Sequence, residues 1–232
     1  MLTDPKEIEI ISKARQPNVR DPKRKREPFN RIFEDFLSSV DLNGRSVIDL
    51  GPGQFDFCTI AEERGASNCT AIDIDPAVVA LGRHRGYTVS EACLQELASN
   101  PIAERVFDGV FCKYSFNAFW YVGNENEHRK FLDSLTNMIG EDGWSWLSPW
   151  NGVPRGITEN SAAEFQRNYF IEKGFSVYEL DVEQSKVYGV HGKTYNRPIF
   201  TRNLPEVSNI EIIHSTEGKS VFSRFLRRLF SE

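Results

Sequence analysis

The stretch VIDLGPGQFDF, residues 47–57, decides the fold of this chain. It begins with apolar residues that predict a short buried strand, and Asp49 lies near the end of that strand. Gly51 and Gly53 follow, and a helix is expected directly after them. Two glycines let the backbone turn sharply, and they let a ligand approach main-chain N–H groups without a Cβ in the way. The stretch therefore predicts a strand, a glycine turn that can hold a ligand, and a helix.

Strands and helices alternate on the C-terminal side of this stretch. Two late β-like pieces, 186–190 and 197–201, have no helix between them and predict an antiparallel hairpin. The alternation itself predicts an α/β fold with a doubly wound, mostly parallel sheet. The predicted strands cover 46–50, 69–74, 87–90, 106–112, 144–148 and 175–182, and the predicted helices cover 29–40, 54–64, 76–84, 95–103, 126–139 and 159–172.

The chain divides into three parts by composition. Residues 1–27 form a polar segment with a basic cluster at its end, 28–204 hold the α/β domain, and 205–232 form a tail. Residues 219–230 of the tail predict a basic amphipathic helix. It could pack on its own domain, form a dimer contact, dock on a partner or lie on an anionic membrane surface. The basic cluster at 20–26 is expected to be solvated, with a lid over the site or contact with an anionic acceptor as alternatives.

The composition limits the class of protein. With 232 residues, 40% of them hydrophobic and 26% charged, the chain can bury one sizeable core. No apolar run approaches the roughly 18–20 residues of a membrane-spanning helix, and MLTDPKEIEI at the start lacks the apolar block of a signal peptide. The formal net charge of -5 argues against a general nucleic-acid binder. These features favour a cytoplasmic protein, with membrane contact through 219–230 as an addition and the oligomeric state open.

The cysteines and two of the histidines give no sign of a metal site. The cysteines have no CxxC spacing and no histidine cluster beside them, which favours buried thiols over a metal or disulfide role. His84 and His128 lie on predicted helices and are expected at the surface. The four cysteines are Cys58, Cys69, Cys93 and Cys112.

A second acid, Asp73, lies at the end of the second predicted strand. In a doubly wound sheet its carboxylate lies beside the glycine turn, where it can accept hydrogen bonds from both hydroxyls of a ribose. A dinucleotide site would need a third glycine where this chain has Asp56, and an acid there would face a pyrophosphate. Asp49 also suits a ligand with positive charge. S-adenosylmethionine (SAM), net positive at neutral pH, is therefore favoured, and a NAD(P)-linked oxidoreductase is the alternative.

Four segments, taken together, resemble the class I SAM-dependent methyltransferases. DLGPG at 49–53 resembles the first motif of that family, and AIDID at 71–75 resembles the second. FDGVFCKYSF at 107–116 resembles the motif of the fourth strand, and residues 128–150 resemble the following helix, glycine turn and fifth strand. The similarity covers residues 29–201. It implies a seven-strand sheet of order 3-2-1-4-5-7-6, SAM as the cofactor and methyl transfer as the activity.

The resemblance also implies roles for single residues. Asp49, Gly51 and Gly53 would hold the methionine end of SAM, and Asp73 would hold the ribose with Ile74 against the adenine.

Two positions depart from the family pattern. Many relatives have an acid that holds the adenine amino group, whereas this chain has Cys93 there, so adenine recognition would involve Cys93, backbone groups or Glu91. Metal-dependent relatives have an acid after the fourth strand, whereas this chain has Lys113, which argues against a catalytic divalent cation. The chain also lacks the NPPY-like tetrapeptide typical of enzymes that methylate adenine or glutamine amides.

The acceptor side is expected above the fourth and fifth strands. A base is needed if the acceptor is an alcohol, and the candidates are Lys113 and His191. A solvated or ion-paired lysine and a turn histidine are the alternatives. We expect metal-free O-methylation of a small molecule or glycan, with a non-catalytic SAM-binding scaffold as a further alternative. The residues expected to line the acceptor pocket are aromatic and amide side chains that suit a sugar or an aromatic metabolite: Tyr114, Asn117, Trp120, Trp150 and Asn151.

Overall fold

The computed structural model describes residues 2–23, 25–38, 40–113, 115, 125–148, 159–179 and 211–213. Several predictions fall outside these residues: the hairpin at 186–190 and 197–201, the helix at 219–230, Tyr114, Asn117, Trp120, Trp150, Asn151 and His191.

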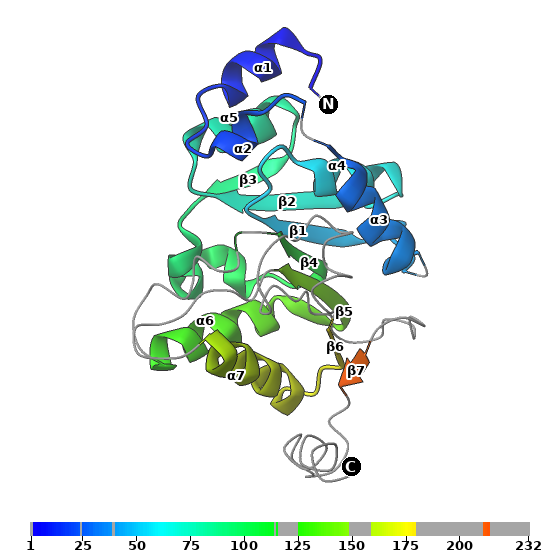
Figure 1. Ribbon diagram of the computed structural model, residues 1–232, viewed down its shortest axis with the longest axis vertical. Helices are drawn as coiled ribbons and strands as arrows, with labels where there is room; N and C mark the ends of the chain where they lie inside the picture. The colour runs from blue at the N-terminus through cyan, green and yellow to red at the C-terminus, as the bar shows by residue number, and fades with distance from the viewer. Residues whose placement is uncertain are drawn as a thin grey trace, which may run out of the picture.

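Five parallel strands form the central sheet in the order β3-β2-β1-β4-β5, which is the order that the family resemblance implies for the first five strands (Figure 1). Neighbouring strands run parallel throughout, so their C-terminal ends meet at one edge. The strands are β1 (Ser46–Leu50), β2 (Asn68–Asp73), β3 (Thr88–Glu91), β4 (Phe107–Lys113) and β5 (Ile139–Ser148).

Helices connect these strands in the expected alternation. After β3 the connection consists of two short 3-10 helices, whereas the sequence predicts one α-helix at 95–103. The α-helices are α1 (Pro5–Ile11), α2 (Pro17–Arg20), α3 (Glu27–Asp35), α4 (Asp56–Glu63), α5 (Pro76–His84), α6 (Glu125–Asn137) and α7 (Glu159–Glu172), and the 3-10 helices are η1 (Leu94–Ser99) and η2 (Pro101–Glu104).

The sheet is covered on both faces, because successive side chains of a strand point to opposite sides. On one face, Phe33 of α3 and Phe57 of α4 stack on each other, and Phe57 stacks on Phe111 of β4. On the other face, Leu132 of α6 and Phe170 of α7 pack in one buried cluster with Ile48 of β1. The architecture is therefore the three-layer α/β arrangement expected from the sequence.

The last described strands differ from the expected end of the sheet. β6 (Val177–Glu179) pairs antiparallel with β7 (Glu211–Ile213) in a separate two-stranded sheet. β7 belongs to the stretch that the sequence assigns to the C-terminal tail. Its three residues, Glu-Ile-Ile, are too short a pattern to mark a strand within that tail.

The N-terminal segment is packed on the domain, whereas Arg20, Lys23 and Lys25 of the basic cluster at 20–26 are exposed, as expected. Ile11, Ala14 and Val19 are buried and belong to the same cluster as the helices α3, α4 and α5. Figure 1 shows α1 and α2 beside α5 at one end of the molecule. Among the described residues, no helix combines the length and the apolar character needed to span a bilayer.

Candidate functional site

The glycine turn after β1 has the backbone conformation that the sequence predicts. Gly51 has a φ of 82° and Gly53 a φ of 57°, in the left-handed region that side chains disfavour. The N–H of Gly51 donates to the carbonyl of Ile72 at 2.9 Å, which ties the turn to β2. A Cβ at Gly51 would lie 1.9 Å from the Oγ of Ser115. The turn thus requires glycine for its conformation and for the close approach of Ser115, which follows the fourth strand.

Two carboxylates lie at this edge of the sheet, as expected. Asp49 is 2% exposed on β1, one residue before the end of the strand. Asp73 is the last residue of β2 and is half-buried, and its Oδ1 accepts the N–H of Asp75 at 2.8 Å. Burial raises the pKa of Asp73 to about 6, although the N–H donor opposes that rise. The site therefore holds an acid that titrates near neutrality.

The two expected adenine-side residues follow β2 and β3. Ile74 is 51% exposed, an unusual position for a large apolar side chain. Cys93 comes two residues after β3 and is a free, half-buried thiol. The N–H of Ala92 donates to the carbonyl of Asp73 at 3.1 Å, which joins these two connections. Ile74 can therefore cover a flat apolar ligand beside Asp73.

Lys113 ends β4 at the same edge as Asp49. Phe111 pairs with Asp49 in the register of β1 and β4, so Lys113 lies two residues beyond that pair. The ammonium group of Lys113 is 4.7 Å from the centre of the Phe29 ring of α3, a cation–π contact. On the neighbouring strand, Lys113 pairs with Ser148, whose Oγ is buried and makes no hydrogen bond to any of the described residues. Lys113 is thus held by α3 on the side where the acceptor is expected.

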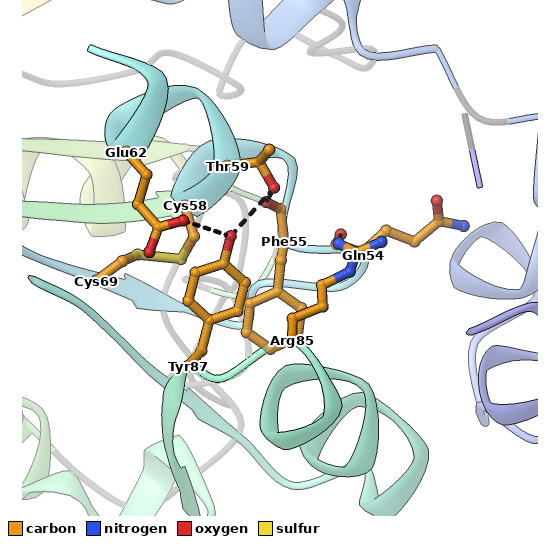
Figure 2. Close-up of a disulfide and its surroundings, with 8 residues drawn as sticks. All are labelled: Gln54, Phe55, Cys58, Thr59, Glu62, Cys69, Arg85 and Tyr87. Carbon is orange, nitrogen blue, oxygen red and sulfur yellow. Dashed lines mark hydrogen bonds between the residues drawn. A yellow bond between two sulfur atoms is a disulfide. The ribbon is translucent and has the colours of Figure 1, made fainter. Parts of the chain in front are cut away.

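A group of side chains that the sequence analysis missed packs against the glycine turn from the segment after α5 (Figure 2). Phe55 has a φ of 63° and is the one non-glycine residue with positive φ in the described part of the chain. Its ring stacks on that of Tyr87, with ring centroids 5.0 Å apart and an interplanar angle of 5°. The guanidinium of Arg85 donates to the carbonyl of Gln54 at 2.7 Å. Arg85 and Tyr87 lie far along the chain from the turn, so no local pattern could have indicated them.

The cysteine prediction is wrong for one pair. Cys58 of α4 and Cys69 of β2 form a disulfide, whereas Cys93 and Cys112 are free thiols (Figure 2). The helix after the glycine turn packs directly on the neighbouring strand, which brings its first turn against Cys69. The spacing of the cysteines in the sequence does not indicate this tertiary contact.

The prediction for His128 is also wrong. His128 is 4% exposed and packs between the rings of Phe131 and Phe165, at 6.2 and 5.6 Å. Burial lowers its pKa to about 4, so the imidazole is neutral at physiological pH. His84, by contrast, is exposed, as expected, with its Nε2 3.4 Å from the carboxylate of Asp4.

Comparison with known families and curated proteins points to methyltransferases. Residues 48–147 match a family described as a methyltransferase domain. Ribosomal protein L11 methyltransferases of Yersinia pseudotuberculosis and Yersinia pestis are 34% identical to this chain over 85 residues. The match covers 36% of this chain, and it spans 29% of the length of those relatives.

Solved structures share the fold at low sequence identity. A SAM-dependent methyltransferase from Archaeoglobus fulgidus has a TM-score of 0.53 at 14% identity, over 77% of this chain and 95% of its own. The N-methyltransferase NodS from Bradyrhizobium japonicum, with S-adenosylhomocysteine, has a TM-score of 0.52 at 12% identity, over 88% and 100%. Magnesium protoporphyrin IX methyltransferase from Synechocystis, with bound SAM, has a TM-score of 0.52 at 15% identity, over 77% and 79%.

Proposed function

Residues 48–147 match a methyltransferase-domain family and the chain shares its fold with SAM-dependent methyltransferases, and from that premise we propose that it transfers the methyl group of SAM to an oxygen of a small-molecule or glycan acceptor. One observation carries the proposal. A turn that must be free of Cβ atoms at Gly51 lies at the same sheet edge as the carboxylates of Asp49 and Asp73. Two acids beside an open backbone suit a nucleoside that carries positive charge, and they disfavour a pyrophosphate.

The described residues fit SAM as follows. Without a Cβ, Gly51 and Gly53 let the methionine end approach the backbone of the turn, and the carboxylate of Asp49 lies on the strand just before it. Asp73 accepts hydrogen bonds from the ribose hydroxyls, and Ile74 covers the adenine. Cys93 lies on the adenine side. When bound, SAM supplies a methyl group on a sulfonium, which is a good leaving group, so the main task of the protein is alignment of the acceptor.

On the acceptor side, Lys113 is the described residue that we assign a direct role. Its ammonium group lies against Phe29 and can orient an acceptor oxygen or, in its neutral form, accept a proton from it. His191 is the second candidate base. Tyr114, Asn117, Trp120, Trp150 and Asn151 remain the proposed lining of the acceptor pocket. No metal ion is needed in this scheme, because positioning and one base suffice for an alcohol.

A second candidate acceptor is a protein. It is favoured by the relatives named ribosomal protein L11 methyltransferase, which are 34% identical over 85 residues. Because the match spans 29% of their length, it supports methyl transfer more directly than it supports the choice of acceptor.

The test is release of S-adenosylhomocysteine (SAH) from SAM in the presence of separate acceptor pools: sugars, phenols, amines and ribosomal protein. We expect turnover with a hydroxylated small molecule, a mass increase of one methyl group on its oxygen, and equal rates with and without a metal chelator. Asp73→Asn serves as the control that weakens cofactor binding. Turnover with ribosomal protein alone would favour the second candidate, and loss of turnover with the chelator would reject the metal-free scheme.

A further inference from the structure

Residues 2–23, here called the N-terminal clasp, are hydrogen-bonded to both loops of the cofactor site. The backbone N–H of Arg15 donates to Oδ2 of Asp75, the residue two positions after Asp73, at 2.5 Å. On the other loop, the side-chain amide of Gln54 donates to the carbonyls of Val19 and Asp21, at 2.7 and 2.6 Å. The clasp therefore contacts the loop after β1 and the loop after β2, at residues next to Gly53 and Asp73.

A partly buried ion pair holds the clasp at a third point. Arg85, which follows α5, donates to both carboxylate oxygens of Glu7 in α1, at 2.6 and 2.8 Å. The side chains of Arg85 and Glu7 are 19% and 15% exposed, so water screens this pair weakly. The hydrogen bonds from Arg85 lower the pKa of Glu7. A two-pronged contact of this kind also fixes the direction of the guanidinium group.

Arg85 also donates a hydrogen bond to the glycine turn. Its Nη1 donates to the carbonyl of Gln54 at 2.7 Å (Figure 2). Gln54 is 3% exposed, and both its side-chain amide and its backbone carbonyl form hydrogen bonds within the protein. A single residue thus receives a hydrogen bond from the ion pair and gives two to the clasp.

The turn needs such support because its next residue is in an unfavourable conformation. Phe55 has a φ of 63°, which costs free energy for a residue with a Cβ, and such a conformation persists only where surrounding contacts impose it. The Phe55 ring is held by Tyr87 and lies where a Cβ on Gly82 would come within 2.3 Å of it. Packing fixes the ring, and hydrogen bonds through Gln54 fix the backbone just before it.

We propose that docking of the N-terminal clasp sets the affinity of the protein for SAM and SAH, with Gln54 and Arg85 as positioning residues. The docked clasp holds the glycine turn in the conformation that receives the cofactor, so less ordering remains to be done on binding. Because coupling between two binding events is reciprocal, the cofactor in turn holds the clasp closed. The inference rests on the use of SAM and is independent of the acceptor.

Calorimetry with SAH tests the coupling in Gln54→Ala, Arg85→Ala and Arg85→Lys. Gln54→Ala and Arg85→Ala each should weaken SAH binding by about tenfold, within the usual range of coupling between sites. Arg85→Lys should recover part of that loss, because the ammonium keeps one contact to Glu7. The matched control is Glu9→Gln, on the same helix as Glu7 but in an exposed pair with Lys13, and it should bind SAH as the unaltered protein does.

Hydrogen exchange distinguishes positioning from mere stabilisation. SAH should slow exchange in residues 2–23 of the unaltered protein and of Glu9→Gln, and it should lose that effect in Arg85→Ala. Should Arg85→Ala fail to fold, Glu7→Gln removes the charge of the pair while keeping its size, and both readouts apply to it. SAH affinity within twofold of the unaltered protein in Gln54→Ala and in the ion-pair variant would overturn the proposal. A protein that binds SAH but methylates nothing in the acceptor pools would leave it intact.

Discussion

At the scale of single residues, the least usual feature of the site is the acid at the end of β2. Asp73 has a pKa of about 6 because it is half-buried, while its neighbour Asp75 spends its carboxylate on two backbone N–H groups. The ribose hydroxyls and the positive charge of SAM both favour the ionised form of Asp73. Protonation and cofactor binding therefore compete for this side chain.

The affinity for SAH should fall as the pH drops below about 6, by up to tenfold per pH unit, because the carboxylate must lose its proton before it can accept two hydroxyl donors. Asp73→Asn should weaken binding by about 10- to 150-fold at pH 7.5 and abolish this pH dependence. Calorimetry between pH 5 and pH 8 measures both effects. A wild-type affinity that is constant over this range would show that Asp73 does not bind the ribose as a carboxylate.

His128 gives a second pH dependence, in stability. Its pKa is about 4 in the folded protein because the ring is buried between Phe131 and Phe165, and an unfolded chain has a pKa near 6.5. Because the folded pKa of His128 is lower than the unfolded one, the contribution of the neutral ring to the free energy of unfolding is fully present above pH ~6.5. It is lost as the pH falls toward 4, because protons then bind the unfolded chain preferentially. The loss amounts to about 3 kcal/mol.

His128→Phe should remove that loss, because a phenyl ring fills the same aromatic site without a proton to gain. Urea unfolding at pH 7.5 and pH 4.5 checks the prediction, with His84→Gln as the control at an exposed position. Equal acid destabilisation of His128→Phe and the unaltered protein would place the acid-sensitive group elsewhere. The sequence holds a signal for this burial that the sequence analysis did not use, because His128, Phe131, Leu132 and Leu135 are spaced to share one face of a helix.

At the scale of elements, the disulfide joins the helix that starts at the glycine turn to the strand that ends at Asp73. Cys58 and Cys69 are 0% and 3% exposed, and 11 residues separate them in sequence. Closing a loop of this length stabilises a fold by about 3 kcal/mol in the chain-entropy account. The bridge therefore fastens α4 to β2 behind the cofactor site.

Protein purified without reductant and treated with oxidised glutathione should show two alkylatable thiols under denaturing conditions, those of Cys93 and Cys112. Cys69→Ala should lower the free energy of unfolding by about 3 kcal/mol relative to the oxidised protein. Cys93→Ala, at a free thiol, is the control and should remove one label at little cost in stability. Labelling of all four thiols after the glutathione treatment would contradict the bridge.

The sequence predicted elements best where a local pattern repeats. The five parallel strands and the glycine turn follow from alternation in hydropathy and from Gly51 and Gly53, and the structure confirms them. Local sequence patterns could not predict contacts between distant segments. The bond from Arg85 to Gln54, the disulfide and the packing of Ile11 each depend on how the chain returns on itself. The positive φ of Phe55 could likewise not be predicted from the sequence, because tertiary packing imposes it against the local preference of the residue.

At the scale of the whole molecule, cofactor binding and folding are linked, since the site is built from both loops, the clasp and two strands. SAH at about 100 times its Kd should raise the free energy of unfolding by about 2.7 kcal/mol. For a chain of this size, that corresponds to a rise in Tm of about 5–10 °C. NAD should leave Tm unchanged, because Asp49 and Asp56 would face its pyrophosphate.

Thermal unfolding with SAM, SAH and NAD at matched concentrations checks this linkage, and Asp73→Asn should lose most of the shift with SAH at the same concentration. The comparison distinguishes a SAM site from a NAD site. A doubly wound sheet can hold either cofactor, and the acids at its edge decide which one binds. A larger shift with NAD than with SAH would mean that these carboxylates do not exclude a pyrophosphate, and the oxidoreductase alternative would then account for the site better than methyl transfer does.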